Sequence, residues 1–288
     1  MHLKLATLKK MRLYVQQKQT KKPEKPYVPH LGFTYPDVLD AHMIPPKKEI
    51  DLVIDENYPF LDKSFGFRFK SALLYLGIFV IVFFISPIRF GLRIEGRNIL
   101  KKYRKLLRGG ALTVANHVHR WDFLIILQAI RYRRSYFPAW PENLTGSDRT
   151  LIRLVGGIPI PRDIHTMRYF NRAFEELHNK RKWLHAFPEG SNWHYFQPIR
   201  PFKKGMFTLA YQYNIPVIPM AFSYRESRGI YKIFKKNYPL ITLRIGEPIL
   251  PDLSKPRREA ATLLREQTHR KIVELAGITD NPYPCDGD

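Results

Sequence analysis

The sequence has little cysteine and few acidic residues, and each shortage excludes or favours a class of protein. Cys285 is the only cysteine in 288 residues, which excludes an intrachain disulfide and a thiolate metal cluster. The 25 Asp and Glu residues stand against 48 Lys and Arg residues, which gives a formal net charge of +23. Such an excess favours an anionic partner: a nucleic acid, an acidic membrane surface or a phosphorylated substrate.

Several motifs are also missing. There is no G-x-S-x-G elbow, which disfavours an esterase of the α/β-hydrolase type. There is no G-x-x-x-x-G-K-[ST] segment, which disfavours a P-loop nucleotidase. The first residues alternate apolar and basic side chains without an apolar core, so we do not expect them to act as a secretory signal.

The composition changes twice along the chain. Residues 1–62 are basic and rich in proline, which predicts an extended arm because dense prolines disfavour long helices and central strands. Residues 63–92 contain the one long apolar segment, and residues 93–280 have the composition of a folded domain. We therefore expect an arm, an apolar helix and one globular domain.

The apolar segment has no charged residue from Ser71 to Ile88. As a helix it would be roughly 27 Å long, just short of a typical hydrocarbon core. It could span a membrane, enter one leaflet or lie in a protein core, and we predict a membrane-associated helix. Basic residues crowd into residues 89–108. That bias places the following domain on the cytoplasmic side and attracts anionic headgroups.

Short apolar runs alternate with helical patterns after residue 110. The expected strands are ALTVA, GIPIP, WLHAF, PVIPMAF and LITLRIG, and the expected helices include WDFLIILQAIR, MRYFNRAFEELH and PRREAATLLREQTHRKIVELAG. This alternation predicts an α/β domain with a mixed sheet flanked by helices. Sites in such folds lie at the carboxyl ends of strands, which is where the polar segments NHVHRWD, PRD and PEGS fall.

The segment NHVHRWD, residues 116–122, has two possible chemistries. His117 and His119 could share a metal ion, but the spacing of the other histidines supplies no third ligand, and we predict no metal. Alternatively, Asp122 begins a helix and accepts the Nδ1–H of His117, which leaves Nε2 free to take a proton. On this pair alone, an ordinary capping aspartate beside a histidine is the simpler interpretation.

Four sequence blocks in a fixed order favour the catalytic interpretation of this pair over the capping one. NHVHRWD, GGIPIPRD, FPEGS followed by PFKKG, and IPVIPMAF together resemble the glycerolipid acyltransferase family, in particular the bacterial 1-acylglycerol-3-phosphate acyltransferases, over roughly residues 85–250. The resemblance implies a glycerol-3-phosphate acyltransferase-like fold and a catalytic domain over residues 93–280. It also implies site residues: the catalytic pair His117 and Asp122, and substrate-binding Arg162, Glu189, Gly190, Ser191 and Pro219.

The third block departs from the family at Asn192. The family has an arginine there as a phosphate ligand, whereas an amide carries no charge. Lys203, Lys204 or Arg200 could replace that cation, and we include Lys203 and Lys204 among the expected substrate-binding residues. Otherwise, the acceptor carries less charge than a phosphomonoester.

The sequence therefore predicts a membrane enzyme that moves an acyl group from acyl-CoA or acyl-ACP to a lysolipid such as lysophosphatidic acid, without a cofactor. A less charged lysolipid acceptor is one alternative, and a lipid hydrolase of the same fold is another. A non-enzymatic basic module that binds nucleic acid is a third. We do not expect nucleic acid, because the aromatic residues fall largely in apolar strand and helix patterns rather than among basic residues.

Overall fold

The computed structural model describes residues 27–43, 52–144, 149–235 and 238–285. The basic segment over residues 1–26 and part of the expected arm lie outside these ranges. A seven-stranded sheet forms the centre, with the strand order β1-β7-β6-β2-β5-β3-β4. The strands are β1 (Arg93–Glu95), β2 (Leu112–Ala115), β3 (Ser135–Ala139), β4 (Gly157–Pro159), β5 (Trp183–Ala186), β6 (Val217–Arg225) and β7 (Leu240–Ile245).

The sheet is mixed, as predicted, because only β6 and β7 pair antiparallel whereas the other neighbours pair parallel. All five expected strands are present, and the sequence analysis missed β1 and β3. β1 has only three residues, and β3 contains Pro138, which argues against a central strand. The pairing of β3 with β5 ends at Tyr136, so Pro138 lies beyond it.

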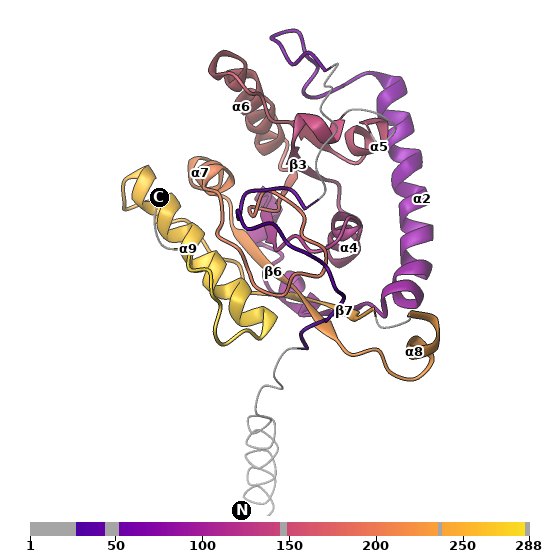
Figure 1. Ribbon diagram of the computed structural model, residues 1–288. Coiled ribbons are helices and arrows are strands. Elements are labelled where there is room, and N and C mark those ends of the chain that lie inside the picture. The colour runs from indigo at the N-terminus through magenta and orange to yellow at the C-terminus, as the bar shows by residue number, and fades with distance from the viewer. Residues whose placement is uncertain (1–26, 44–51, 145–148, 236–237, 286–288) are drawn as a thin grey trace, which may run out of the picture.

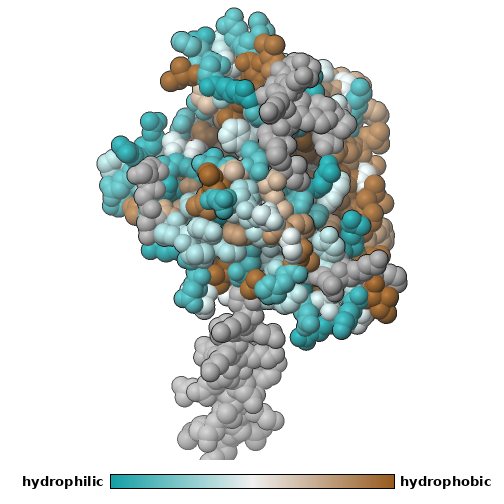
Figure 2. Space-filling view, in the orientation of Figure 1, coloured by the Kyte–Doolittle hydropathy of each residue, from teal (hydrophilic) through white to brown (hydrophobic). Residues whose placement is uncertain are grey.

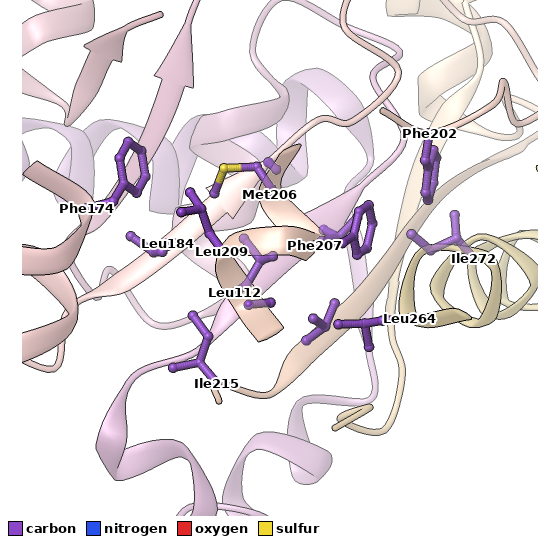
Figure 3. Packing of buried hydrophobic residues seen from close by; sticks show 14 of the residues in the cluster. Leu112, Phe174, Leu184, Phe202, Met206, Phe207, Leu209, Ile215, Leu264 and Ile272 are labelled. Atoms are coloured by element: carbon purple, nitrogen blue, oxygen red, sulfur yellow. The ribbon is translucent and has the colours of Figure 1, made fainter. Parts of the chain in front are cut away.

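Helices cover both faces of the sheet (Figure 1). They are α2 (Phe65–Phe90), α3 (Arg97–Lys102), α4 (Asp122–Ala129), α5 (Arg149–Leu154), α6 (Ile164–Asn179), α7 (Gly205–Gln212), α8 (Ile230–Lys235) and α9 (Arg257–Ala276), with short 3-10 turns η1 (Leu106–Gly109) and η2 (Pro141–Leu144). One hydrophobic core joins the sheet to α6, α7 and α9, and Figure 3 shows some of its side chains. A second core joins the other face to α2 and α4.

Strand β2 shows why the central strands are apolar without interruption. Leu112 and Val114 pack in the core under α6, α7 and α9, whereas Ala111 and Ala115 pack in the core under α2 and α4. Alternate side chains point to opposite faces, and both faces are covered. A parallel sheet buried in this way is built from continuous hydrophobic runs.

Helix α2 packs against the domain along its whole length. Ser64 caps its start, and Gly91, in a left-handed conformation, ends it. One stripe is buried, namely Ser71, Ile78, Val82, Ser86 and Phe90. Among the described residues it is the one helix long and apolar enough to cross a membrane. Most of its remaining apolar side chains are exposed and contribute the hydrophobic edge on the side of the molecule where α2 lies (Figures 1 and 2).

The parallel strands bring distant segments to one edge of the sheet. β2, β5, β3 and β4 run in the same direction, so their carboxyl ends meet there. His117 follows β2, Phe187 follows β5, Trp140 follows β3 and Arg162 follows β4.

Candidate active site

His117 and Asp122 meet across the turn between β2 and α4. Asp122 is the first residue of α4 and is fully buried. Its Oδ2 lies 3.1 Å from Nδ1 of His117 and accepts the backbone N–H groups of Val118 at 2.6 Å and His119 at 2.8 Å. The first turn of a helix favours a carboxylate. The carboxylate thus fixes both the loop and the imidazole.

The ring of His117 is held on a second side by Phe187. The two rings are stacked with centroids 4.1 Å apart and planes at 11°. The His117 side chain remains 22% exposed, and no described residue is hydrogen-bonded to its Nε2. A neutral imidazole that donates from Nδ1 presents a lone pair at Nε2. The geometry therefore leaves one basic nitrogen oriented and accessible.

Asn116 anchors the same loop to the neighbouring strand. Its amide nitrogen donates to the carbonyl oxygen of Phe222 at 3.2 Å, and its amide oxygen accepts the N–H of Phe222 at 2.8 Å. These paired bonds join the end of β2 to β6. Sequence analysis did not single out this residue, because a lone asparagine after a strand has no distinctive spacing.

Glu189 and Arg200 form a buried network behind His117. The Glu189 carboxylate accepts the backbone N–H of His117 at 3.1 Å and the Arg200 guanidinium at 3.0 Å. Burial raises the pKa of Glu189, and the charge of Arg200 opposes this rise. Arg200 also donates to Ser191 Oγ at 2.8 Å, and its side chain is only 1% exposed. These groups therefore hold the backbone around His117, and Arg200 is not accessible to a phosphate.

A segment of the arm, residues 33–43, covers this network. The carbonyl oxygen of Ala41 accepts Ser191 Oγ at 3.1 Å and Trp193 Nε1 at 2.9 Å. The carbonyl oxygen of Leu39 accepts Arg200 at 3.0 Å. Tyr35 donates to the carbonyl oxygen of His194 at 2.8 Å. The arm thus supplies hydrogen-bond acceptors and a donor to residues 191–200. Its irregular, proline-rich sequence gave no signal from which these contacts could be predicted.

A large cavity of about 970 Å³ opens onto His117. Apolar side chains dominate its lining and come from α2, α4, β3, α6 and α7; they include Leu74, Ile78, Val82, Phe123, Phe137, Phe170 and Leu209. Arg120 and Lys203 also line it. Its volume is at the upper end of the roughly 300–1,000 Å³ found for small-molecule sites. The cavity can hold a long apolar group with its polar end beside the imidazole.

Gly190 and Lys203 are the predicted substrate-binding residues that border this cavity. Gly190 has a φ of +83°, and a Cβ added there would lie 2.9 Å from Cε of Lys203. Trp140 donates to the carbonyl oxygen of Gly190 at 2.8 Å, and the Lys203 ammonium lies 5.3 Å from the Trp140 ring centroid. Trp140 is a further site residue that the sequence analysis missed, because β3 was not recognised.

The other predicted residues lie elsewhere. Ser191 is buried in the Arg200 network, and Pro219 is buried within β6, where its carbonyl oxygen accepts the N–H of Gly246. Lys204 precedes α7 and is absent from the cavity lining; the positive charges of Arg258 and Arg265 on α9 help to lower its pKa, after the larger effect of desolvation. None of these three residues lines the cavity, and their expected binding of substrate stays a prediction.

Arg162 follows β4 at the same sheet edge as His117, but it does not line the cavity. Its side chain is 66% exposed, and its guanidinium forms an ion pair with Glu142 of η2. The neighbouring Asp163 caps α6 instead, by accepting the N–H of Thr166. Asn192 is half-buried, and its Oδ1 has no hydrogen-bond partner among the described residues.

Comparison with known proteins gives consistent matches. A family model described as Acyltransferase matches residues 92–223. An uncharacterized acyltransferase of Schizosaccharomyces pombe is 27% identical over 206 residues, which cover 66% of this chain and 67% of that protein. The crystal structure of the 1-acyl-sn-glycerophosphate acyltransferase PlsC from Thermotoga maritima matches with a TM-score of 0.47 and 22% identity, covering 75% of this chain and 85% of that one.

Proposed function

We propose that the chain is a glycerolipid acyltransferase, in keeping with the Acyltransferase model that matches residues 92–223 and with the Schizosaccharomyces pombe relative, and that it transfers a fatty acyl group from a thioester donor to the hydroxyl of a lysolipid. The observation that carries this proposal is the His117–Asp122 pair beside a large apolar cavity. The donor is acyl-CoA or acyl-ACP, and the first candidate for the acceptor is lysophosphatidic acid, which would give phosphatidic acid. Residues 93–280 form the proposed catalytic domain.

The proposed reaction is a direct transfer. Nε2 of His117 removes the proton from the acceptor hydroxyl as its oxygen attacks the thioester carbonyl carbon. The tetrahedral intermediate then collapses, the carbon–sulfur bond breaks, and the thiolate leaves with the proton that His117 returns. Asp122 orients the ring and stabilises the imidazolium, as a buried carboxylate does in other histidine-based sites. General-base catalysis of this kind contributes about 10²–10⁴-fold.

The distribution of cations supports a phosphate-bearing acceptor. Lys203 and Arg120 border the cavity that contains His117, so Lys203 can replace the charge that Asn192 lacks. Arg162 lies farther out, in an exposed ion pair with Glu142. Such pairs are worth about 0–1 kcal/mol, so a phosphate can compete with Glu142 for the guanidinium. A less charged lysolipid is the alternative that Asn192 favours.

The packing of α2 supports membrane association in the plane of one leaflet. Ser71 donates to the carbonyl oxygen of Leu154 at 2.6 Å near its start, and Tyr231 donates to the carbonyl oxygen of Pro87 at 2.8 Å near its end. A helix held to the sheet domain at both ends cannot project through a bilayer. Eleven large apolar side chains of α2 are exposed, and each gains roughly 1.5–3 kcal/mol on full burial. The proposed face of the membrane remains the cytoplasmic one.

An acyl-transfer assay with a panel of lysolipids tests the function. The purified protein is incubated with acyl-CoA or acyl-ACP and with lysophosphatidic acid, lysophosphatidylglycerol or lysophosphatidylcholine, and the diacyl products are separated. We expect transfer to at least one acceptor and its loss in His117→Ala. Release of free fatty acid without an acceptor would indicate a hydrolase. A folded wild-type protein that transfers to no acceptor from either donor would contradict the proposal.

A further inference from the structure

A second cavity, of about 390 Å³, lies at the opposite edge of the sheet from His117. Its walls are residues 60–63, the first turns of α2, the two glycines at the start of β4, the end of α6 and the residue before β5. The start of α2 and α6 lie at the same end of the molecule (Figure 1). We call this space the basic cavity, because its lining includes Lys63, Arg68, Arg134, Arg153, Lys180 and Lys182.

Two carboxylates accompany these six cations, and both have partners already. Glu176 forms ion pairs with Lys63 at 2.8 Å and with Lys180 at 2.6 Å. Asp62 accepts the backbone N–H of Ser64 at 2.9 Å, next to the start of α2. The remaining cations, Arg68, Arg134, Arg153 and Lys182, form no ion pair within the described ranges, and only Arg153 is close enough to Asp62 to affect its pKa, which hydrogen bonds from Ser64 and the charge of Arg153 lower. The basic cavity therefore carries uncompensated positive charge.

Two of the guanidinium groups are held in place by neutral groups. Arg134 donates to Ser71 Oγ at 2.5 Å and lies 5.6 Å from the ring centroids of Tyr75 and of Tyr136. Its Nε is buried without a hydrogen-bond partner among the described residues. Arg153 donates to the hydroxyl of Tyr58 and to the carbonyl oxygen of Pro59. These contacts orient the guanidinium groups but leave their charge available to a ligand.

We propose that the basic cavity binds the phosphate headgroup of an anionic phospholipid. A planar guanidinium binds phosphate oxygens through paired hydrogen bonds, and basic pockets beside membrane helices are suited to lipid headgroups. Arg68 belongs to α2 itself, between the exposed Phe65 and Phe69. If α2 lies in one leaflet, as proposed above, Arg68 lies at headgroup depth. The small volume suits a headgroup, and the acyl chains would remain beside the apolar face of α2.

This site is separate from the proposed acceptor site, since it rests on the membrane association of α2 and not on acyl transfer. Its ligand could also be a soluble phosphomonoester, because the recognising chemistry is the same. Phosphatidylglycerol vesicles and soluble glycerol 3-phosphate distinguish the two sources. Phosphatidylglycerol is not the proposed product, so its binding does not report on product bound near His117.

The experiment measures sedimentation of the full-length protein with phosphatidylcholine vesicles and with vesicles in which part of that lipid is phosphatidylglycerol. The variants are Arg68→Ala and Lys182→Ala. Arg270→Ala is the matched control, because it removes the same charge from an exposed position on α9. We expect each cavity variant to lose about fivefold in affinity for the anionic vesicles, the effect of one membrane-proximal basic residue. Arg270→Ala should change it less than twofold, because salt screens distant charges.

Binding to pure phosphatidylcholine should be unchanged in all three variants, since it depends on α2. An equal loss in Arg270→Ala would show diffuse attraction to a basic protein and overturn the proposal. Unchanged binding of both cavity variants to anionic vesicles would overturn it as well. If glycerol 3-phosphate binds with the same dependence on Arg68 and Lys182 while the vesicles do not, the cavity holds a soluble phosphate and the lipid assignment is wrong. If the wild-type protein does not bind neutral vesicles at all, the membrane role of α2 is refuted, and the lipid assignment that rests on it is refuted too.

Discussion

Replacing Asp122 with asparagine removes the negative charge beside the proposed base, His117, while keeping the shape of the side chain. In the structure, one buried oxygen serves the His117 ring and two backbone N–H groups at once. An asparagine can still accept from the backbone through its amide oxygen. It cannot stabilise the imidazolium that forms when His117 takes a proton. The variant therefore separates the chemistry from the fold of the loop.

The size of the effect follows from the distance. For unit charges about 4 Å apart at an effective dielectric constant of about 20, the interaction is about 4 kcal/mol, or roughly 10³-fold in rate. The His117 side chain is 22% exposed, so water screens part of this energy. We expect a loss of about 10²–10³-fold in turnover. The cost in stability should be only about 1 kcal/mol, the typical net value of one hydrogen bond.

The assay measures steady-state acyl transfer together with thermal unfolding. His119→Ala is the control, because the variant keeps the backbone N–H that His119 donates to Asp122; its loss in turnover should stay below about tenfold. Turnover of Asp122→Asn within tenfold of wild type in a folded protein would refute the proposed role. Equal losses in both variants, together with bound zinc in stoichiometric amount, would favour a metal site.

Three further predictions address the acceptor, the membrane and the acid stability. Arg162→Lys should raise the acceptor KM more than the donor KM, because an ammonium cannot bind phosphate bidentately. Asn192→Arg should raise activity on lysophosphatidic acid only if the natural acceptor is less charged. Unchanged acceptor kinetics in both variants would show that the phosphate binds elsewhere. Phe84→Glu on the exposed face of α2 should weaken vesicle binding in a flotation assay, whereas Ile164→Glu on α6, which is also apolar and exposed, should not. Equal vesicle binding by the two variants would exclude α2 as the anchor. Burial lowers the pKa of His185 from 6.5 to about 3. The unfolded chain therefore binds a proton at this residue below pH 6.5, whereas the folded chain does not. As a result, the free energy of unfolding falls as the pH drops from 6.5 towards 3. Between pH 6.5 and 5 the unfolding free energy should fall by about 2 kcal/mol from this group, a slope that His185→Gln should flatten in denaturant titrations.

Local sequence patterns were sufficient to predict most strands of the sheet and the close approach of His117 and Asp122. Runs such as PVIPMAF are apolar because both faces of β6 are covered, so burial is visible in the sequence itself. The turn from β2 into α4 spans few residues, so the distance between His117 and Asp122 depends on local geometry. β3 was missed because Pro138 contradicts its assignment, and only the partners that it meets in the sheet explain its presence.

Contacts between distant segments could not be predicted in this way. The sequence around Arg200 does not show whether this residue is a buried partner of Glu189 or an exposed phosphate ligand. Its burial depends on distant contacts such as the carbonyl oxygen of Leu39, which lies 161 positions away and accepts a hydrogen bond from the guanidinium. Likewise, Pro219 and Ser191 match family blocks but are buried, and the sequence pattern alone does not distinguish a buried residue from one that contacts substrate.

The same long-range contacts decide how the membrane anchor can be tested. Deleting residues 1–88 would seem the direct experiment for an apolar helix near the beginning of the chain. However, this deletion removes the carbonyl groups of Leu39 and Ala41 that accept Arg200 and Trp193. It also removes the α2 side chains that line the cavity at His117. A truncated protein would lose activity and stability whether or not α2 binds lipid. A single charge on the outer face of α2 changes the membrane contact and leaves the buried stripe intact, so it tests the anchor alone.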